Sequence, residues 1–476
     1  MTGESSAAQN AAGGTGGATG EISSGFRMMI RTMQTRGNMS RLTGFLLLVS
    51  LVLVHASCSN SDAAPSARNE SAATKKEETR WLKGNLHTHT LWSDGNDFPE
   101  MVGQWYRDQG YNFLALSDHN ILSEGDKWLS IAESKRQNLD VAVKKYRERF
   151  PDVIKVRAGA KGEEIRLSTL DDVKKLVEKP GQFIMIQSEE VTSNFPTTGT
   201  DGKERRLPVH MNATNVAELI PPATGTSVRD IIRKNFQAAE AQAKKLNRPI
   251  VTHLNHPNFQ WGVTAEDLAS VVEERYFEVY NGHPGTNTRG DATRPSTDKI
   301  WDIANTIRLA QLNAEPLFGL GTDDSHHYHT PGMMRSTPGR GWIMLRAKDL
   351  SVDSVMAALK SGNFYASSGV TLRDVKYDPS TKKITVEIEP DGDAVFTTDF
   401  VGTPKDFADG GKTPLDSEAV GKTFASVTGT TASYTLSGDE LYVRAVINSN
   451  KPPAVPSYEN QHAQAWTQPV GWEKKK

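Results

Sequence analysis

Short apolar runs recur through the middle of the chain, and each one gives way to polar or ionisable residues. The clearest runs cover residues 113–116, 183–186, 249–251, 276–280 and 317–321. Strands that are buried on both faces of a parallel sheet show this pattern, because their side chains meet apolar neighbours until the chain reaches a turn. The runs therefore predict buried parallel strands.

Helical patterns fill the gaps between these runs. Residues 227–246 place apolar side chains at helical spacing, and residues 353–360 predict a shorter helix that Gly362 closes. Thr169 and Thr264 each precede acidic residues, as helix N-cap residues do. Strands that alternate with helices predict an α/β barrel-like domain over residues 80–370.

The pattern changes after residue 370. Residues 384–388 and 441–447 alternate between apolar and polar side chains, and residues 465–470 are typical of a last strand. Such alternation indicates strands with one solvated face. We expect a small C-terminal antiparallel β domain over residues 371–476, which supports the packing of the barrel, caps it or binds a partner.

The N-terminal region resembles an export signal. Its apolar core, residues 42–56, follows Arg36 and Arg41 and is short for a membrane span but right for a signal peptide. Cys58 comes directly after Ala56 and Ser57, as in a bacterial lipoprotein signal. We expect an extension and signal peptide over residues 1–58, a flexible tether over residues 59–79, and an exported protein that meets the membrane only through a lipid on Cys58. The alternatives are a secreted protein cut after Ala56 and a retained anchor.

Composition narrows the chemistry. Cys58 is the single cysteine, which excludes an internal disulfide framework and a cysteine-based zinc site. Hydrophobic residues make up 37% of the chain, as in a soluble domain. The net charge of −2 gives no support to a surface that coats nucleic acid.

Histidines and carboxylates gather where the predicted strands end. The clusters are His87-Thr88-His89 with Asp94, Asp118-His119, Glu189-Glu190, His253 with His256, and Asp324-Ser325-His326, with His210 alone between the third and the fourth. The carboxyl ends of the parallel strands of a barrel meet at one face, so side chains there converge. Imidazoles and carboxylates are ligands that suit Zn, Mn and Fe. We therefore expect one site for several metal ions.

These clusters resemble the motifs of the PHP superfamily, named after bacterial DNA polymerases and histidinol phosphatase. The matching motifs are His87-x-His89 with Ser93-Asp94-Gly95, Ser117-Asp118-His119-Asn120, Glu190-Val191-Thr192, Asn255-His256-Pro257 and Asp324-Ser325-His326, all in family order. The segment Glu278-Val279-Tyr280-Asn281-Gly282 looks closer to the carbaryl-hydrolase-like branch. The resemblance implies a distorted (β/α)7 barrel with up to three metals at the carboxyl ends of its strands.

The resemblance also implies a ligand set. Carried over residue by residue, the ligands are His87, His89, Asp94, His119, Glu190, His210, His256, Asp324 and His326. Together they would hold two or three divalent ions, with Mn, Fe and Zn as the candidates.

Two of these positions have an acidic neighbour that could bind instead. Glu190 is preferred over Glu189 because the glutamate of the family precedes an apolar residue and then Ser or Thr. Asp324 is preferred over Asp323 because of the Asp-x-His spacing.

Two further residues of the clusters have other expected roles. Asp118 is expected to orient a ligand rather than to bind a metal. His253 lies three residues before His256, so in an extended strand the two side chains face opposite sides. Structural and functional roles are both open for His253.

Three arginines are candidates for substrate binding. Arg205 and Arg206 precede His210, and Arg340 lies between two glycines after the last ligand cluster. A guanidinium group can bind a phosphate through two hydrogen bonds. Exposed basic loops and a turn into a strand are the alternative interpretations.

The expected activity is metal-dependent hydrolysis, in which a metal-activated hydroxide attacks the substrate. The resemblance favours a phosphomonoester or phosphodiester substrate, with nucleotides and oligonucleotide ends among the candidates. The catalytic candidates are Glu190, which would bridge the metals, and His119, His256 and Asp324, any of which could handle a proton. The alternatives are a carbamate or carboxylic ester hydrolase on the same site and a non-catalytic surface metal-binding protein.

Overall fold

The computed structural model describes residues 79–199 and 201–474. The expected signal peptide, Cys58 and all but the last residue of the tether lie outside these ranges, so those expectations stay predictions. Among the described residues, none of the helices combines the length and the apolar composition that a membrane span requires.

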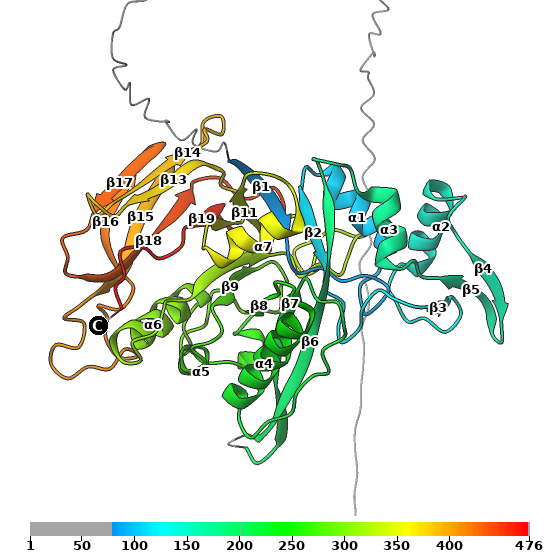
Figure 1. The fold of residues 1–476 in the computed structure, drawn as a ribbon, viewed down its shortest axis with the longest axis horizontal. Coiled ribbons are helices and arrows are strands. Elements are labelled where there is room, and N and C mark those ends of the chain that lie inside the picture. The colour runs from blue at the N-terminus through cyan, green and yellow to red at the C-terminus, as the bar shows by residue number, and fades with distance from the viewer. Residues whose placement is uncertain (1–78, 200, 475–476) are drawn as a thin grey trace, which may run out of the picture. The chain divides into compact units, whose positions relative to one another are not determined.

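A sheet of thirteen strands is the largest element among the described residues (Figure 1). Six of its strands point the same way: β1 (Arg80–Asn85), β2 (Phe113–Leu116), β6 (Ile184–Thr198), β8 (Val251–Leu254), β9 (Tyr276–Asn281) and β10 (Phe318–Thr322). Along the sheet the order is β10-β9-β8-β7-β6-β2-β1. β7 (Glu204–Thr214) runs antiparallel to both β6 and β8. The apolar runs of the sequence therefore do form parallel strands, with one reversed strand among them.

These strands do not close into a barrel through regular pairing. β10 pairs with β9 and lies at the edge of the sheet, whereas the free side of β1 pairs with the antiparallel strand β11 (Trp342–Ala347). The chain segments that follow β1 and β10 meet at one isolated bridge, between Thr88 and Ser325. The predicted mixed α/β class is confirmed, but the expected distorted (β/α)7 barrel is not seen as a closed barrel, because β11 pairs with the free side of β1 and β10 stays at the edge of the sheet.

Helices connect and cover the strands. They are α1 (Pro99–Asp108), α2 (Leu139–Arg149), α3 (Leu170–Val177), α4 (Val228–Leu246), α5 (Ala265–Ser270), α6 (Thr297–Ala310), α7 (Val352–Lys360) and the 3-10 helix η1 (Phe259–Trp261). Both predicted N-caps form: Thr169 accepts a hydrogen bond from the backbone of Asp172, and Thr264 forms a capping box with Asp267. α4 packs beside β6, β7 and β8 (Figure 1).

Two smaller sheets lie outside this arrangement. One forms in the insertion between β2 and β6, from β3 (Trp128–Ser130), β4 (Val156–Gly159) and β5 (Gly162–Arg166). The other contains β13 (Leu372–Asp378), β14 (Lys383–Ile388) and β17 (Thr431–Thr435). Both are antiparallel.

The C-terminal strands also extend the large sheet. In spatial order they are β12 (Phe364–Ser367), β19 (Gln464–Trp466), β18 (Glu440–Ser449), β15 (Phe396–Pro404) and β16 (Lys422–Thr428). The antiparallel pairing expected after residue 370 is present, but β19 joins β12 and makes this region continuous with the strands before it. A domain boundary at residue 370 stays a prediction.

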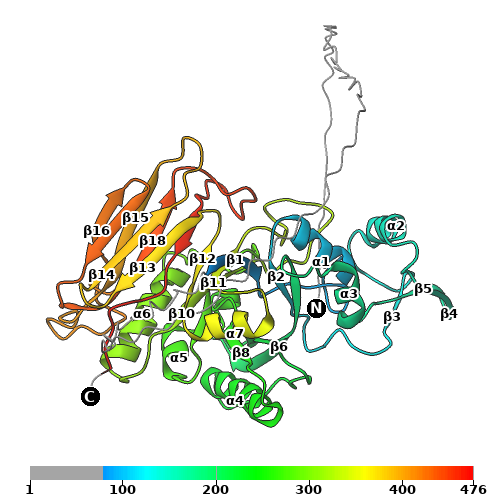
Figure 2. The same cartoon turned by 45° about the horizontal axis from the view of Figure 1, so that its top comes forward.

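A buried ion pair fastens the C-terminal strands to α6, which lies against β15 and β18 (Figure 2). The guanidinium of Arg444 donates hydrogen bonds of 3.0 and 2.8 Å to the carboxylate of Asp302. The Tyr442 hydroxyl donates a third bond, of 2.6 Å, to the same group. Removing one partner of such a pair costs about 3–5 kcal/mol, because the other charge stays buried. These contacts favour the packing role expected for this region.

Candidate metal centre

All the histidines and carboxylates carried over as ligands come together at the end of the sheet where the parallel strands have their carboxyl ends. His87 and His89 follow β1, His119 follows β2, Glu190 lies within β6, His210 lies within β7, His256 follows β8, and Asp324 and His326 follow β10. The parallel strands bring their carboxyl ends to the same side. β7 runs the other way and contributes His210 because that residue pairs with Thr192 of β6.

Glu190 lies at the middle of this cluster and is fully buried. Its carboxylate oxygens approach five imidazole nitrogens: His119 Nδ1 at 2.8 Å, His210 Nδ1 at 3.0 Å, His89 Nε2 at 3.3 Å, His87 Nε2 at 3.4 Å and His256 Nε2 at 3.5 Å. One carboxylate with ligand nitrogens on several sides is suited to bridging two metal ions.

Asp324 forms a second point of convergence. Its Oδ1 lies 3.3 Å from His87 Nε2 and 3.2 Å from His89 Nε2, and its Oδ2 lies 4.0 Å from His256 Nε2. The backbone of Asp324 has a positive φ of 49°. Left-handed backbone at a residue other than glycine is strained and is often found at functional sites.

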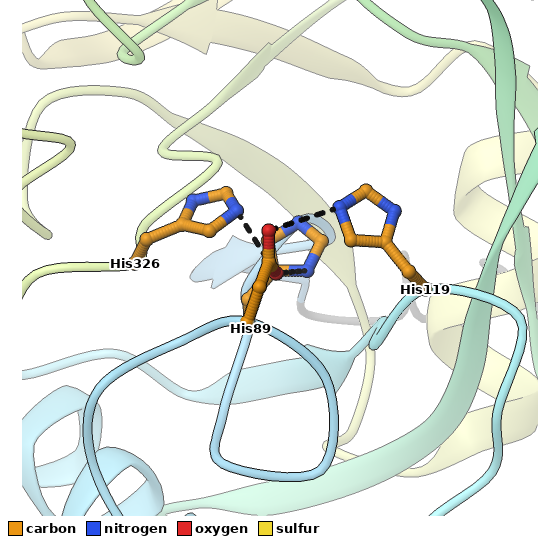
Figure 3. A group of neighbouring side chains, drawn as sticks. His89, His119 and His326 are labelled. Carbon is orange, nitrogen blue, oxygen red and sulfur yellow. Dashed lines mark ion pairs between the residues drawn. The ribbon is translucent and has the colours of Figure 1, made fainter. Parts of the chain in front are cut away.

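Asp94 gathers the third part of the cluster. Figure 3 shows the rings of His89, His119 and His326 around one carboxylate, and the three ion pairs identify it as that of Asp94, at 3.6, 3.5 and 3.3 Å. The side chain of Asp94 is 43% exposed, whereas His89 is fully buried. Asp94 therefore marks the side of the cluster that faces solvent.

The ligand atoms divide into overlapping groups whose members lie within 4.8 Å of one another. Four of the five groups consist of expected ligands alone: His89, Asp94, His119 and His326; His87, His89 and Asp324; His87, Glu190 and His256; and His119, Glu190 and His210. The fifth group joins His87 to His253 and Glu278. Zinc in proteins has four ligands in structural sites and three plus water in catalytic ones. The cluster offers more ligands than one such ion can use.

Several of these atoms have no other role in the structure. His87 Nε2, His89 Nε2 and Glu190 Oε2 are buried, and none of them has a hydrogen-bond partner among the described residues. Leaving a buried polar group unpaired costs about 1–3 kcal/mol. A divalent cation held among these atoms would give all three of them a partner. The donor set therefore fits divalent metals.

The histidines and carboxylates of the cluster shift one another's pKa values. Burial alone would raise the pKa of Glu190, but the imidazoles of His119, His87 and His210 hold it well below the ordinary value. Burial would lower the pKa of His87, but the carboxylates of Asp324, Glu278 and Glu190 raise it well above the ordinary value. Glu190 is therefore ionised at neutral pH and competent to bind a cation.

The neighbouring acidic residues at the two ambiguous positions point elsewhere. Glu189 turns away from the cluster and accepts a 2.8 Å hydrogen bond from the backbone of Ile220, and burial raises its pKa to about 7. Asp323 accepts hydrogen bonds from the Tyr106 hydroxyl and from the backbone of Gly339, Arg340 and Gly341. The structure places Glu190 and Asp324, and not these two, among the histidines.

Asp118 holds the loop that carries Asp94. It accepts hydrogen bonds of 2.8 Å from both the backbone and the hydroxyl of Thr90, and bonds of 3.0 and 2.5 Å from the backbone and hydroxyl of Ser93. Its contacts are thus with the segment between His89 and Asp94, as expected for a residue that orients ligands.

Glu278 is an important residue that sequence reasoning did not identify. Its Oε1 lies 2.6 Å from His87 Nδ1, and its Oε2 accepts bonds of 2.8 Å from the backbone of His256 and from the side chain of Asn281. Glu278 therefore fixes the orientation of two ligands, through the ring of His87 and the backbone of His256. Apart from the family resemblance of the segment that it begins, its signal in the sequence is a carboxylate within an otherwise apolar run.

His253 lies next to Glu278. Its Nε2 is 3.6 Å from Glu278 Oε1, it is fully buried, and neither ring nitrogen has a hydrogen-bond partner among the described residues. The expected opposite facing of His253 and His256 does not decide their roles. His256 has left the strand and has a φ of 20°, so strand alternation does not apply to it.

We expect Glu278→Gln to weaken metal binding by roughly 10–100-fold, the usual effect of removing a residue that orients a ligand. The amide is a weaker acceptor for the ring N–H of His87 and therefore holds that ring less firmly. Titration of the metal-loaded protein with a competing chelator measures the change.

Glu274→Gln is the matched control for this prediction. Glu274 is also fully buried and precedes β9, but its side chain accepts from Thr252 at 2.5 Å and from its own backbone neighbours. Equal metal affinity in the two variants would contradict the role given to Glu278.

The three candidate arginines are not brought to the metal cluster. Arg340 is fully buried and its guanidinium donates to the backbone carbonyls of Gly282, Gly332 and Arg335, which favours a structural role. Arg205 is exposed and pairs with Asp201 at 3.1 Å. Arg206 lies four residues before His210 in β7, about 13 Å away at the usual rise of a strand.

Comparisons with known proteins give distant matches. No protein-family model and no curated protein matches the chain. A two-domain protein from Bacteroides vulgatus ATCC 8482, described as containing a predicted PHP-like metal-dependent phosphoesterase, has 13% identity over 82% of this chain and 95% of its own, with a TM-score of 0.35. PsfC from Pseudomonas syringae PB-5123 has 11% identity over 56% and 82% of the two chains, with a TM-score of 0.27.

A third solved structure, described as a candidate metal-dependent phosphoesterase from Bifidobacterium adolescentis ATCC 15703, has 13% identity over 54% of this chain and 91% of its own, with a TM-score of 0.25. The nearness to the carbaryl-hydrolase-like branch stays a prediction. The resemblance to the PHP superfamily therefore rests on the motifs of the sequence.

Proposed function

We propose that the chain is a metal-dependent hydrolase of phosphate esters that uses two or three divalent ions, with Mn, Fe and Zn as the candidates. The observation that carries this proposal is the convergence of buried, unpaired imidazole nitrogens and carboxylate oxygens from the ends of separate strands. Divalent ions held in such a site supply Lewis acidity, which activates water and stabilises charge on an ester oxygen.

The residues of the chain have distinct tasks in this proposal. Glu190 joins the parts of the cluster, because its two oxygens face different sets of histidines. Asp324 holds the opposite side of the cluster, and Asn281 fixes its Oδ2 with a 3.1 Å hydrogen bond. Asp94 is the exposed member and lies where a substrate from solvent would arrive.

His283 and Phe259 border this side of the cluster. The ring of His283 lies 5.6 Å from that of His326, and Phe259 lies 5.1 Å from that of His256. Burial lowers the pKa of His283 to about 4, so its ring is neutral at pH 7. Its Nδ1 accepts a hydrogen bond from the backbone of Gly285, which leaves Nε2 with the proton and able to donate to an ester oxygen.

Hydrolysis of three substrates measured side by side tests the proposal. The substrates are p-nitrophenyl phosphate, bis(p-nitrophenyl) phosphate and 1-naphthyl methylcarbamate, each with the protein after reconstitution with Mn, Fe or Zn. We expect turnover of a phosphate ester that a chelator abolishes and metal restores. Turnover of the carbamate alone would assign the site to carbonyl chemistry, and binding of metal without turnover of any ester would indicate a non-catalytic metal-binding protein.

A further inference from the structure

A basic groove lies at the extended end of the β6–β7 hairpin, where its residue Arg206 is four positions along β7 from the ligand His210. It has a volume of about 680 Å³ and is lined by Arg205, Arg206, Leu207, Gln260, Trp261 and Arg294. Three of these six side chains are guanidinium groups, so the groove attracts anions.

Arg206, one of the residues that line the groove, lies on the same face of the hairpin as the ligand His210. In the antiparallel register, Thr192 pairs with His210, and Pro196 pairs with Arg206. Alternate residues of a strand face the same side, so His210 and Arg206 share a face. Four residues separate them, which corresponds to about 13 Å along the strand.

The segment around η1 forms a continuous wall between the two places. Phe259 contacts the ligand rings, 6.1 Å from that of His210 and 5.1 Å from that of His256, and Trp261 lines the groove two residues later. Gly262 lets this wall lie against β7, because a Cβ there would come within 2.2 Å of the Pro208 carbonyl oxygen.

The wall is held in an unusual conformation. Gln260 and Trp261 have φ values of 47° and 60°, in the left-handed region that disfavours residues other than glycine. Neighbouring contacts fix this shape: the Arg294 guanidinium lies 4.3 Å from the centre of the Trp261 ring. Strained backbone of this kind is concentrated at ligand sites.

The charges in the groove are unequally neutralised. Arg205 pairs with Asp201, and Arg294 pairs with Asp291 at 3.3 Å. Arg206 is exposed and forms no ion pair with any residue in the described ranges. An unpaired guanidinium about 13 Å along the strand from His210 is too far to touch an ester at the metal centre, but is placed to bind another part of the same molecule.

We propose that this groove binds a second phosphate of the substrate, so that the ester cleaved at the metal centre belongs to a molecule with a further phosphate about 13 Å along the hairpin. The inference rests on the phosphoesterase activity proposed above. It narrows the substrate class from simple esters to extended molecules with several phosphates. A short single-stranded oligonucleotide and a long-chain bisphosphate share this chemistry.

Kinetics on substrates of increasing length test the subsite in the full-length protein. The probes are 5′-phosphorylated oligothymidylates of two to six residues, alkanediol bisphosphates of matched length, and p-nitrophenyl phosphate, which has one phosphate. We expect Arg206→Ala and Arg294→Ala to lower kcat/KM on the longer substrates by roughly tenfold, mainly through KM, because each removes a charged contact. The loss on p-nitrophenyl phosphate should be clearly smaller.

Two charge-matched controls lie close by. Lys203→Ala removes a cation near the tip of the same hairpin. Arg289→Ala removes an arginine from the loop that carries Arg294. The Arg289 guanidinium lies 4.3 Å from the ring centre of Tyr458 and does not line the groove. Neither should change kcat/KM on any of the probes. Losses in the controls as large as those in Arg206→Ala, or equal losses on short and long substrates, would overturn the subsite.

The same experiment separates this inference from the proposed function. Turnover of p-nitrophenyl phosphate with no preference for longer substrates and no dependence on Arg206 would overturn the subsite and leave the activity standing. If no phosphate ester is hydrolysed, binding of a phosphorothioate hexathymidylate, followed by fluorescence anisotropy, still tests the groove. Weaker binding by Arg206→Ala than by Lys203→Ala supports it, and equal binding overturns it.

The two series of long substrates identify the recognised group. A dependence of kcat/KM on Arg206 for the oligothymidylates only would identify a nucleotide substrate. The same dependence for both series would identify the phosphate alone as the recognised group.

Discussion

Glu190→Gln is expected to abolish phosphate ester hydrolysis, whereas Glu189→Gln is expected to retain most of it. Glu190 is the carboxylate that five imidazoles surround, and glutamine offers one neutral oxygen in its place. We expect kcat to fall at least about 10³-fold, since loss of a single stabilising group in an active site already costs about 10²–10³-fold.

Glu189 provides the matched comparison because it is the adjacent residue of the same strand, with the same shape and similar burial. Its Oε2 accepts from the backbone of Ile220, and glutamine can keep that hydrogen bond through its carbonyl oxygen. We expect kcat within about tenfold of the unmodified protein. Loss of activity in Glu189→Gln with activity kept in Glu190→Gln would mean that β6 is shifted by one residue, since such a shift exchanges the two faces of a strand.

Removal of metal should destabilise the fold as well as inactivate the protein. Without a cation, the buried nitrogens of His87 and His89 and one oxygen of Glu190 have no partner among the described residues. A ligand that binds only the folded state stabilises it by about 2.7 kcal/mol when its concentration is 100 times its Kd. We therefore expect a chelator to lower Tm and added Mn, Fe or Zn to restore it.

Thermal unfolding with and without chelator measures this effect, and Glu190→Gln serves as the control. The variant should show a smaller shift between the stripped and the metal-loaded state. An unchanged Tm after stripping and reconstitution of the unmodified protein would contradict a metal centre that contributes to folding.

Local patterns predict much of this molecule because its strands are buried on both faces. Residues 113–116 form β2, and the predicted helix of residues 227–246 forms α4 with Ser227 as its cap. Most of the ligand residues follow the carboxyl ends of parallel strands. Apolar runs that end in polar residues reveal such strand ends in the sequence. His210 lies on a reversed strand and belongs to none of the quoted motifs, and it entered the ligand set through the resemblance to the family as a whole.

Long-range pairing is what the sequence does not predict. The reversal of β7 and the pairing of β11 with β1 depend on contacts between distant segments, so local patterns cannot tell whether the expected distorted barrel closes. The glycines on both sides of Arg340 make it a candidate for binding a phosphate in the sequence, but three carbonyl groups enclose its guanidinium. Glu278 looks like part of a strand in the sequence, and its role depends on His87, which precedes it by 191 positions.

Elemental analysis of the purified protein after reconstitution tests the central claim most directly. The overlapping ligand groups around Glu190, Asp324 and Asp94 predict two or three equivalents of Mn, Fe or Zn per chain. One equivalent or fewer, under conditions in which the protein is folded and metal is in excess, would contradict a centre of several metal ions.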